Sequence, residues 1–351
     1  MINSSFFPFL LLLLSSSPLP TSSFSSLPLS LSFLPSPKSS SSPLSPLFST
    51  PRLTFYDVIR LKEQEFSAFR KAHSSPEDPL QVMLGYFEAE PDFSRFKKLA
   101  RATRRLSELD PAASPMHDPR NTNRLLSVGL DLKRSTPSSP TFSCAFDSAG
   151  SVAASLSSVV DFVFVNADYR HYGGDVEDVK ETVNALKDTG VPVIFKDLVI
   201  DPLQLALAKS LGCDGMLVIA GVLGPDLTEL LNTATLLNFP IIVECHTPEE
   251  VTVAVEAGAS YILVNRRDRL TNEIHLAQPF AVRDLLPPGN VLTILATGGV
   301  ETPEECRELL DAGYDGVVMG QALVGNPKAH AKVREVKELE IGEGADFLNM
   351  Y

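Results

Sequence analysis

The chain has 351 residues, of which 44% are hydrophobic and 21% are charged, and its formal net charge at pH 7 is −13. This length suffices for one large core, such as that of a barrel of about 250 residues. The acidic balance argues against a nucleic-acid surface, and without an apolar run of roughly 18 residues no membrane span is expected. The four cysteines lie far apart in the sequence, at Cys144, Cys213, Cys245 and Cys306. Because no two of them have the close spacing typical of disulfide frameworks or zinc sites, neither a disulfide framework nor a metal site is predicted.

The first 50 residues differ in composition from the rest of the chain. Ser, Pro and Leu dominate them, Asp and Glu are absent, and Lys38 is the single basic side chain. Such a segment cannot bury enough apolar surface to fold, and acid-free, Ser-rich leaders resemble plastid transit peptides. We therefore expect residues 1–50 to be a disordered transit peptide and the mature protein to lie in the plastid stroma. A secretory signal is the alternative, because residues 6–14 form an apolar run.

Residues 51–124 are predicted to form an N-terminal helical extension that ends in a loop. Apolar residues recur at helical spacing from Phe55 to Phe69, and residues 93–106 show a second helical pattern. Three prolines between Asp110 and Asn123 indicate a loop. The basic residues of the second helix are interpreted as a solvated helix face rather than a nucleic-acid site.

Eight apolar segments, each bounded by Gly, Pro, Asp or Asn, follow in the remainder of the chain. We predict strands at Leu125–Leu132, Asp161–Val165, Pro192–Phe195, Gly215–Ile219, Pro240–Val243, Tyr261–Val264, Val291–Ala296 and Gly316–Met319. Helical patterns lie between them, and several begin with Asp-Pro or Thr-Pro start signals. This alternation favours an α/β fold, a (β/α)8 TIM barrel over residues 125–351. A doubly wound open sheet is the alternative, although such sheets more usually stop at five or six strands.

The residues that follow the predicted strands should ring the end of the barrel where such folds carry their active sites. In chain order these residues are Lys133, Asn166, Lys196, Ala220, Glu244, Asn265, Thr297 and Gly320. Lysine and glutamate directly after buried strands indicate an acid–base and anion-binding site. We expect burial beside other charges to move their pKa values toward neutrality. The alternative is that the lysines extend to solvent and that Glu244 only pairs with one of them.

A phosphate-binding site is predicted after the last two strands. Thr297-Gly-Gly299 follows the seventh strand, and Gly320-Gln-Ala-Leu323 follows the eighth. Backbone N–H groups in such turns, beside a short helix, form the phosphate site of many barrels. The predicted contacts are Gly298, Gly299, Gly320 and Gln321, and plain tight turns are the alternative.

Five segments with distinctive side chains occur in order between residues 125 and 325. They are Lys133-Arg-Ser-Thr-Pro-Ser138, Tyr169-Arg-His-Tyr-Gly-Gly174, Phe195-Lys-Asp-Leu-Val-Ile-Asp-Pro-Leu-Gln204, Val243-Glu-Cys-His246 and Val264-Asn-Arg-Arg-Asp268. In this order the segments resemble the motifs of the indole-3-glycerol-phosphate synthase family, and the third segment is the most specific. The resemblance implies a carboxy-lyase of tryptophan biosynthesis without metal or organic cofactor. Its phosphorylated substrate would be 1-(2-carboxyphenylamino)-1-deoxyribulose 5-phosphate, whose indole ring closes with loss of carbon dioxide and water.

The resemblance also implies a role for each matching residue. Lys196 would be the general acid that protonates the substrate carbonyl, and Lys133 would hold the substrate carboxylate and assist loss of the hydroxyl. Glu244 would stabilise the cationic intermediate or take its proton, and Asp131 would be a further catalytic carboxylate. The substrate contacts would be Asn265 on the ribulose hydroxyls, Arg267 in support of the site, Tyr172 against the aromatic ring, and Thr136.

Two positions at the predicted site depart from the family's usual residues. Asp131 stands where the family usually has Glu, and Thr297-Gly298 stands where it usually has Glu-Ser. The second change removes a carboxylate from the barrel mouth. Two other hypotheses therefore stay open: a diverged enzyme that acts on a related phosphosugar, and a barrel that has lost activity and serves as a non-enzymatic binding or assembly protein in the plastid.

Overall fold

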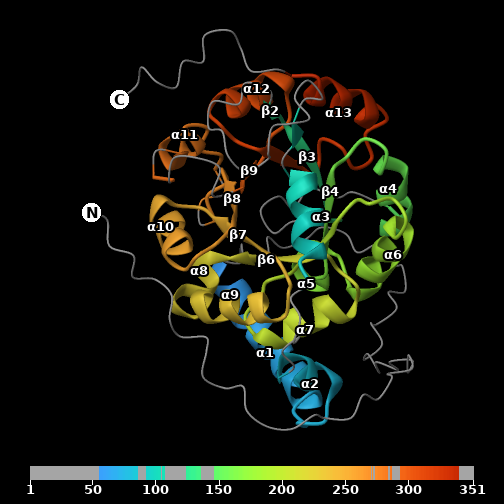
Figure 1. Cartoon of the computed structure of the whole chain (residues 1–351), viewed down its shortest axis with the longest axis vertical. Coiled ribbons are helices and arrows are strands. Elements are labelled where there is room, and N and C mark those ends of the chain that lie inside the picture. The colour runs from blue at the N-terminus through green and yellow to red at the C-terminus, as the bar shows by residue number, and fades with distance from the viewer. Residues whose placement is uncertain are drawn as a thin grey trace, which may run out of the picture. The chain divides into compact units, whose positions relative to one another are not determined.

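A closed barrel of eight parallel strands lies at the centre of the described structure (Figure 1). The computed structural model describes residues 55–85, 92–103, 105–106, 124–135, 146–269, 271, 273–283, 285–286 and 293–339. Around the barrel the strands follow one another in the order β10-β3-β4-β5-β6-β7-β8-β9. Parallel pairing of consecutive strands requires a crossover each time, and helices supply these crossovers. The predicted (β/α)8 barrel is confirmed.

The strand positions agree closely with those expected from the sequence. The barrel strands are β3 (Ser127–Leu132), β4 (Phe162–Asn166), β5 (Val193–Lys196), β6 (Gly215–Ile219), β7 (Ile241–Cys245), β8 (Tyr261–Asn265), β9 (Thr293–Thr297) and β10 (Gly316–Met319). Both β6 and β10 have the predicted bounds. The first predicted strand is divided, because Leu125 belongs to β2 (Arg124–Leu125), which pairs antiparallel with β1 (Arg105–Leu106) outside the barrel.

The helices include three that precede the barrel: α1 (Phe55–Ala72), α2 (Pro79–Gly85) and α3 (Ser94–Thr103). Those around the barrel are α4 (Ala149–Leu156), α5 (Tyr169–Tyr172), α6 (Val176–Leu186), α7 (Pro202–Ser210), α8 (Ala220–Leu223), a 3-10 turn (Gly224–Asp226), α9 (Leu227–Leu236), α10 (Pro248–Glu256), α11 (Gln278–Arg283), α12 (Pro303–Asp311) and α13 (Ala329–Lys337). Three of them, α7, α10 and α12, begin at the proline of an Asp-Pro or Thr-Pro start signal. The residue before each proline, Asp201, Thr247 or Thr302, accepts a backbone N–H with its side chain.

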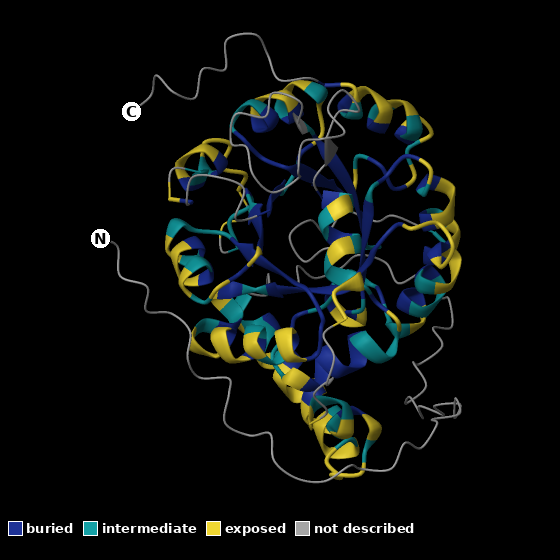
Figure 2. Ribbon diagram, viewed as in Figure 1, coloured by how far each residue is buried: buried dark blue, intermediate teal, exposed yellow. Residues whose placement is uncertain are grey.

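Two layers of buried apolar side chains hold the barrel together, and Figure 2 shows the strands buried and the outer helix faces exposed. One layer lies between strands and helices. The other fills the barrel with Phe162, Phe164, Ile194, Leu217, Ile242, Leu263, Leu295 and Val318. Leu99 of α3 belongs to this inner layer and has no exposed surface. The helix α3 therefore packs against one end of the barrel interior.

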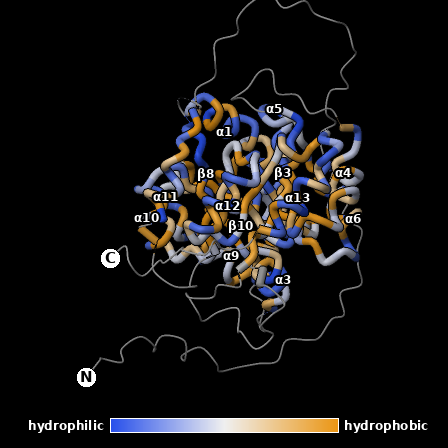
Figure 3. The backbone as a smooth tube through the Cα atoms, turned by 90° about the horizontal axis from the view of Figure 1, so that it is seen from above, coloured by the Kyte–Doolittle hydropathy of each residue, from blue (hydrophilic) through white to orange (hydrophobic). Residues whose placement is uncertain are grey.

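The helix α1 lies at the other end of the barrel from α3 (Figure 3). The guanidinium of Arg269, beyond β8, lies over the Phe55 ring at 5.0 Å. Farther along α1, Lys62 Nζ lies 2.6 Å from Asp197 Oδ1 beyond β5, and Arg70 Nη2 lies 2.6 Å from Asp201 Oδ2. These contacts tie α1 to the loops at the carboxyl ends of the strands. No helix in the described ranges is long and apolar enough to cross a membrane.

Candidate active site

Inward-facing side chains at the carboxyl ends of the strands form the site. Successive strand residues face opposite sides of a sheet, so a residue two places after one in the inner layer also faces the barrel axis. This rule places Asn166, Lys196, Glu244, Asn265 and Thr297 at the barrel mouth, after Phe164, Ile194, Ile242, Leu263 and Leu295. Strand register supports the arrangement, because Asn166 lies beside Lys196, and Asn265 beside Thr297.

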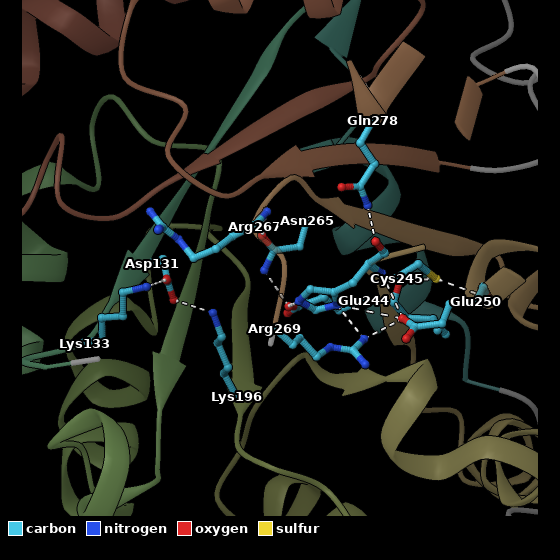
Figure 4. A network of polar contacts seen from close by, with 12 residues as sticks. Asp131, Lys133, Lys196, Glu244, Cys245, Glu250, Asn265, Arg267, Arg269 and Gln278 are labelled. Atoms are coloured by element: carbon cyan, nitrogen blue, oxygen red, sulfur yellow. Dashed lines mark hydrogen bonds and ion pairs between the residues drawn. The ribbon is translucent and has the colours of Figure 1, made fainter. Parts of the chain in front are cut away.

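Asp131 lies between two lysines inside the barrel (Figure 4). Its register partner is Phe164 of the inner layer, so its carboxylate faces the axis. Lys196 Nζ donates to Asp131 Oδ1 at 2.9 Å, and Lys133 Nζ lies 3.0 Å from Asp131 Oδ2. The Asp131 side chain is only 5% exposed, against 18% for Lys196 and 23% for Lys133. One buried carboxylate thus fixes the positions of both ammonium groups.

Glu244 forms the second half of the site, across the barrel from Asp131. Asn265 Nδ2 donates to Glu244 Oε1 at 2.8 Å, and His246 Nε2 lies 3.1 Å from the same oxygen. Arg269 Nη2 contacts His246 Nδ1, and because a guanidinium can only donate, this nitrogen accepts and the ring proton lies on Nε2. The His246 ring therefore donates to Glu244. Sequence analysis assigned His246 no role, although its position two residues after Glu244 put it on the same strand face.

The pKa values of three charged groups in this site lie far from neutral pH. Burial opposes ionisation of Asp131, but the ammonium groups of Lys133 and Lys196 outweigh it and lower its pKa to about 2. Burial disfavours the charged form of Lys196, yet Asp131 and Glu244 raise its pKa above the usual range. For Glu244, burial is overcome by the hydrogen bond from His246 and by the charge of Lys196, and its pKa is lowered.

The shift toward neutrality that was predicted for the pKa values of Lys196 and Glu244 is wrong. Burial alone would have produced it, but each buried charge lies within contact distance of an opposite charge or a hydrogen-bond donor. Favourable pairing outweighs desolvation in all three groups, so each of them keeps its charge near neutral pH. Lys196 is consequently available as an ammonium acid, while Asp131 and Glu244 remain carboxylates.

The loop after β4 carries the predicted aromatic residue over the site. Tyr172 ends the short helix α5 and is half-buried, and burial raises the pKa of its hydroxyl to about 12. The Tyr172 carbonyl accepts the backbone N–H groups of Arg134 and Ser135, both at 3.1 Å. The Arg134 side chain adds a hydrogen bond to the Gly173 carbonyl at 3.0 Å. The loops after β3 and β4, which hold Lys133 and Tyr172, are therefore joined.

A buried ion network beneath α1 supports the same loops. Lys62 is 5% exposed and pairs with Asp197, with Asp168 farther away at 3.8 Å. Asp168 accepts from the His171 backbone in α5, and Asp197 follows Lys196 directly. This lysine lies outside the motifs that guided the sequence analysis, and only its position in a predicted amphipathic helix was visible.

The predicted phosphate turns lie beside the site. Gly298 and Gly299 have φ values of +91° and +80°, in the region that favours glycine. A Cβ on Gly298 would lie 2.4 Å from Asn265 Oδ1, an atom that already accepts the Arg267 backbone N–H at 3.0 Å. Gly320 packs against Asp131, and Gln321 is exposed.

The segment after Gly320 continues as a turn rather than as the short helix found beside many barrel phosphate sites. Residues 321–325 form a turn, in which the Leu323 and Val324 N–H groups donate to the Gly320 carbonyl, and α13 begins only at Ala329. Asn326 and Pro327 interrupt the segment between them.

Thr136, a predicted substrate contact, lies outside the described residues, as does Cys144. Among the described residues, no group of three or more His, Cys, Asp or Glu side chains could hold a metal ion.

Comparison with known proteins identifies the family. The family model described as indole-3-glycerol phosphate synthase matches residues 88–336. The chain belongs to this family. Membership places it among the carboxy-lyases of tryptophan biosynthesis, as the motifs predicted.

Curated relatives agree with the family match. The indole-3-glycerol phosphate synthase of Lachnoclostridium phytofermentans is 31% identical over 219 residues, which cover 60% of this chain and 76% of the relative. That of Methanothermobacter marburgensis is 31% identical over 66% of this chain and 81% of its own length. A Roseiflexus enzyme of the same name is 28% identical over 73% of this chain and 97% of its own length. The alignments thus span most of each relative.

The position of Asp131 between two lysines predicts a defined acid sensitivity of the fold. Its pKa in the folded protein is about 2, whereas an unperturbed aspartate titrates near ~3.9, so the unfolded chain binds the proton first as pH falls. The stability that this difference contributes is fully present above about pH 4 and is lost between about pH 4 and pH 2. It amounts to about 2 kcal/mol.

Asp131→Asn should therefore lose less free energy of unfolding than the wild type between pH 5 and pH 2, while being less stable at pH 7. Urea unfolding across this range measures the difference. Asp188→Asn, at an exposed position, is the matched control and should follow the wild type. An Asp131→Asn curve parallel to that of the wild type would contradict the assignment.

Proposed function

We propose that the chain forms indole-3-glycerol phosphate from 1-(2-carboxyphenylamino)-1-deoxyribulose 5-phosphate, with Lys196 as the general acid. The observation that carries the proposal is the Lys196 ammonium, held by Asp131 at 2.9 Å in the barrel mouth with Glu244 on its other side. Acid on one side and carboxylate on the other is the arrangement that a decarboxylative ring closure needs. Family membership supplies the reaction, and these residues supply its proton donor and its countercharge.

In the proposed ring closure, the aromatic carbon that bears the carboxylate attacks the ketone carbon of the substrate. Lys196 donates a proton to the ketone oxygen, which becomes a hydroxyl, and the ring system acquires positive charge. Loss of carbon dioxide returns the electron pair of the broken carbon–carbon bond to the ring. The hydroxyl then leaves as water with proton assistance from Lys133, and a proton is removed as the indole becomes aromatic.

The charge state of each group suits its proposed step. Because the pKa of Lys196 is raised, the proton is in place when the substrate binds, although a high pKa weakens the driving force for its transfer. Glu244 stays ionised and offers a fixed negative charge to the cationic intermediate. The neutral Tyr172 can pack against the aromatic ring without adding charge to the site.

The shortening from the family's Glu to Asp131 does not separate the carboxylate from the lysines. Asp131 contacts both of them at hydrogen-bond distance, which supports a working catalytic cluster. Thr297 is the substantive departure, since it replaces the family's glutamate by a neutral side chain whose hydroxyl donates to the Val318 carbonyl at 3.1 Å. This loss is the observation that favours the second candidate, a non-enzymatic binding barrel.

Purified protein starting near residue 50 should convert the substrate to indole-3-glycerol phosphate, and Lys196→Ala should lower turnover at least about 10²-fold, the usual size of a general-acid contribution. Fluorescence of the indole product measures both. Lys187→Ala, at the exposed end of α6, is the control for loss of a lysine and should keep wild-type activity.

Near wild-type kinetics in Lys196→Ala would remove this lysine from the mechanism. Absence of turnover in the wild type, together with its absence in a variant that combines Asp131→Glu and Thr297→Glu, would discard the synthase in favour of the binding barrel. Catalytic groups that act as a unit are not rescued singly, so the combined variant is the decisive one.

The substrate phosphate is proposed to bind at the turns of Gly298 and Gly299 and of Gly320 and Gln321. Their place after the last two barrel strands supports this, because backbone N–H groups there commonly bind phosphate. Inorganic phosphate should raise the Tm of the wild type by binding the native state, and chloride at equal ionic strength should not. Gln321→Glu should reduce the phosphate effect, and equal responses to the two salts would contradict the site.

Residues 1–50 are proposed to direct the chain to the plastid. The support is compositional, an acid-free segment rich in Ser and Pro before the first acidic residue, Asp57. Radiolabelled full-length chain incubated with isolated chloroplasts should become protease-protected and shorter by about 50 residues. A protein that stays full-length and protease-sensitive would exclude this destination.

A further inference from the structure

Asn166 carries a polar group for which the described structure provides no partner. Its side chain is 1% exposed, and the side-chain nitrogen Nδ2 is buried without a hydrogen bond. The oxygen Oδ1 accepts the Asp168 backbone N–H at 3.0 Å, which fixes the orientation of the amide. A buried amide N–H without an acceptor is unfavourable and rare in folded proteins, so this one calls for a ligand.

The unpartnered N–H of Asn166 lies at the end of the barrel that carries the proposed catalytic residues. Asn166 lies two residues after Phe164 of the inner layer and in register with Lys196. Its strand, β4, stands between β3 and β5, which carry Asp131 and Lys196. The side chain thus faces the barrel axis between the segments that hold the two catalytic lysines.

Electrostatics identify the kind of ligand. Lys133, Lys196 and Asp131 form a cluster of three charged groups with a net charge of +1, and the Glu244 carboxylate that balances it lies across the barrel. The Asp131 oxygens already accept from both lysines, and Asn166, in register with Lys196 on the adjacent strand, adds an N–H donor on this side of the barrel mouth. A cationic cluster with a spare neutral donor suits an anionic oxygen ligand, and a carboxylate has the single negative charge that balances it.

We propose that Asn166 binds the carboxylate of the substrate, with Nδ2 donating a hydrogen bond to one carboxylate oxygen. The inference rests on the proposed function, which supplies a substrate with a carboxyphenyl group, and it adds a residue that selects for that group. Because the amide is neutral, it can bind the carboxylate without adding another charged proton donor beside the carbon–carbon bond that later breaks.

Two unreactive ligands test this role directly. Reducing the substrate ketone to an alcohol gives 1-(2-carboxyphenylamino)-1-deoxyribitol 5-phosphate, which cannot close the ring. Its counterpart without the carboxylate is 1-phenylamino-1-deoxyribitol 5-phosphate. Calorimetric Kd values for both ligands, with the wild type and the variants, report how much each protein gains from the carboxylate alone.

Asn166→Leu should weaken binding of the carboxylated ligand at least about tenfold, as expected for a hydrogen bond to a charged group. Binding of the ligand without the carboxylate should change less than about twofold. Asn166→Asp keeps an acceptor for the Asp168 N–H, and with it the local fold, but replaces the donor by a negative charge. It should lose the preference for the carboxylated ligand more completely.

A purely structural role would change both affinities together, so an equal loss for the two ligands overturns the inference. Retention of the wild-type preference in both variants overturns it as well, and would show that water or another group satisfies the amide. Either result leaves the proposed function standing if the wild type turns substrate over. A wild type that binds neither ligand and forms no product would overturn the proposed function along with the role of Asn166.

Discussion

The placement of one buried carboxylate between two lysines is the constraint on which the site depends. Two ammonium groups in a barrel mouth repel each other and lose hydration, so neither would be held in place without a countercharge. Asp131 provides it at 2.9 and 3.0 Å, from a strand whose next residues lead directly to Lys133. The inner layer of Phe162 and Phe164 on the adjacent strand keeps this carboxylate away from water, which strengthens both contacts.

Much of the fold was accessible from sequence because a parallel barrel repeats a simple pattern. Strands buried on both faces appear as continuous apolar runs, and the turn residues that bound them are recognisable one by one, which is why Gly215–Ile219 and Gly316–Met319 were predicted to the residue. The same regularity located Lys196 and Glu244 at the mouth. The division at Leu125 was not accessible, since its pairing partner Arg105 lies in a distant segment with no strand pattern.

Properties that depend on contacts between distant segments could not be read in this way. The direction of the pKa shifts of Asp131, Lys196 and Glu244 is decided by which opposite charge lies within a few ångströms, and desolvation alone pointed the other way. The pair of Lys62 and Asp197 joins residues 135 positions apart (197 − 62). Nor does the sequence distinguish an asparagine that caps a strand end from one with an unsatisfied N–H, as at Asn166.

The exchange of a carboxylate for Thr297 changes the electrostatics of substrate binding. In the described mouth, Lys133 and Lys196 face Asp131 and Glu244, so these four charges sum to zero before an anionic substrate arrives. A further glutamate at position 297, in register with Asn265, would make the sum negative and oppose a ligand with a carboxylate and a phosphate. Threonine relieves that repulsion but leaves Glu244 as the carboxylate in contact with Asn265, and in the proposed mechanism proton removal at that side of the barrel would depend on Glu244. Since its pKa is lowered, Glu244 is a weak base, so in the proposed mechanism the exchange would affect the final loss of a proton more than ring closure at Lys196.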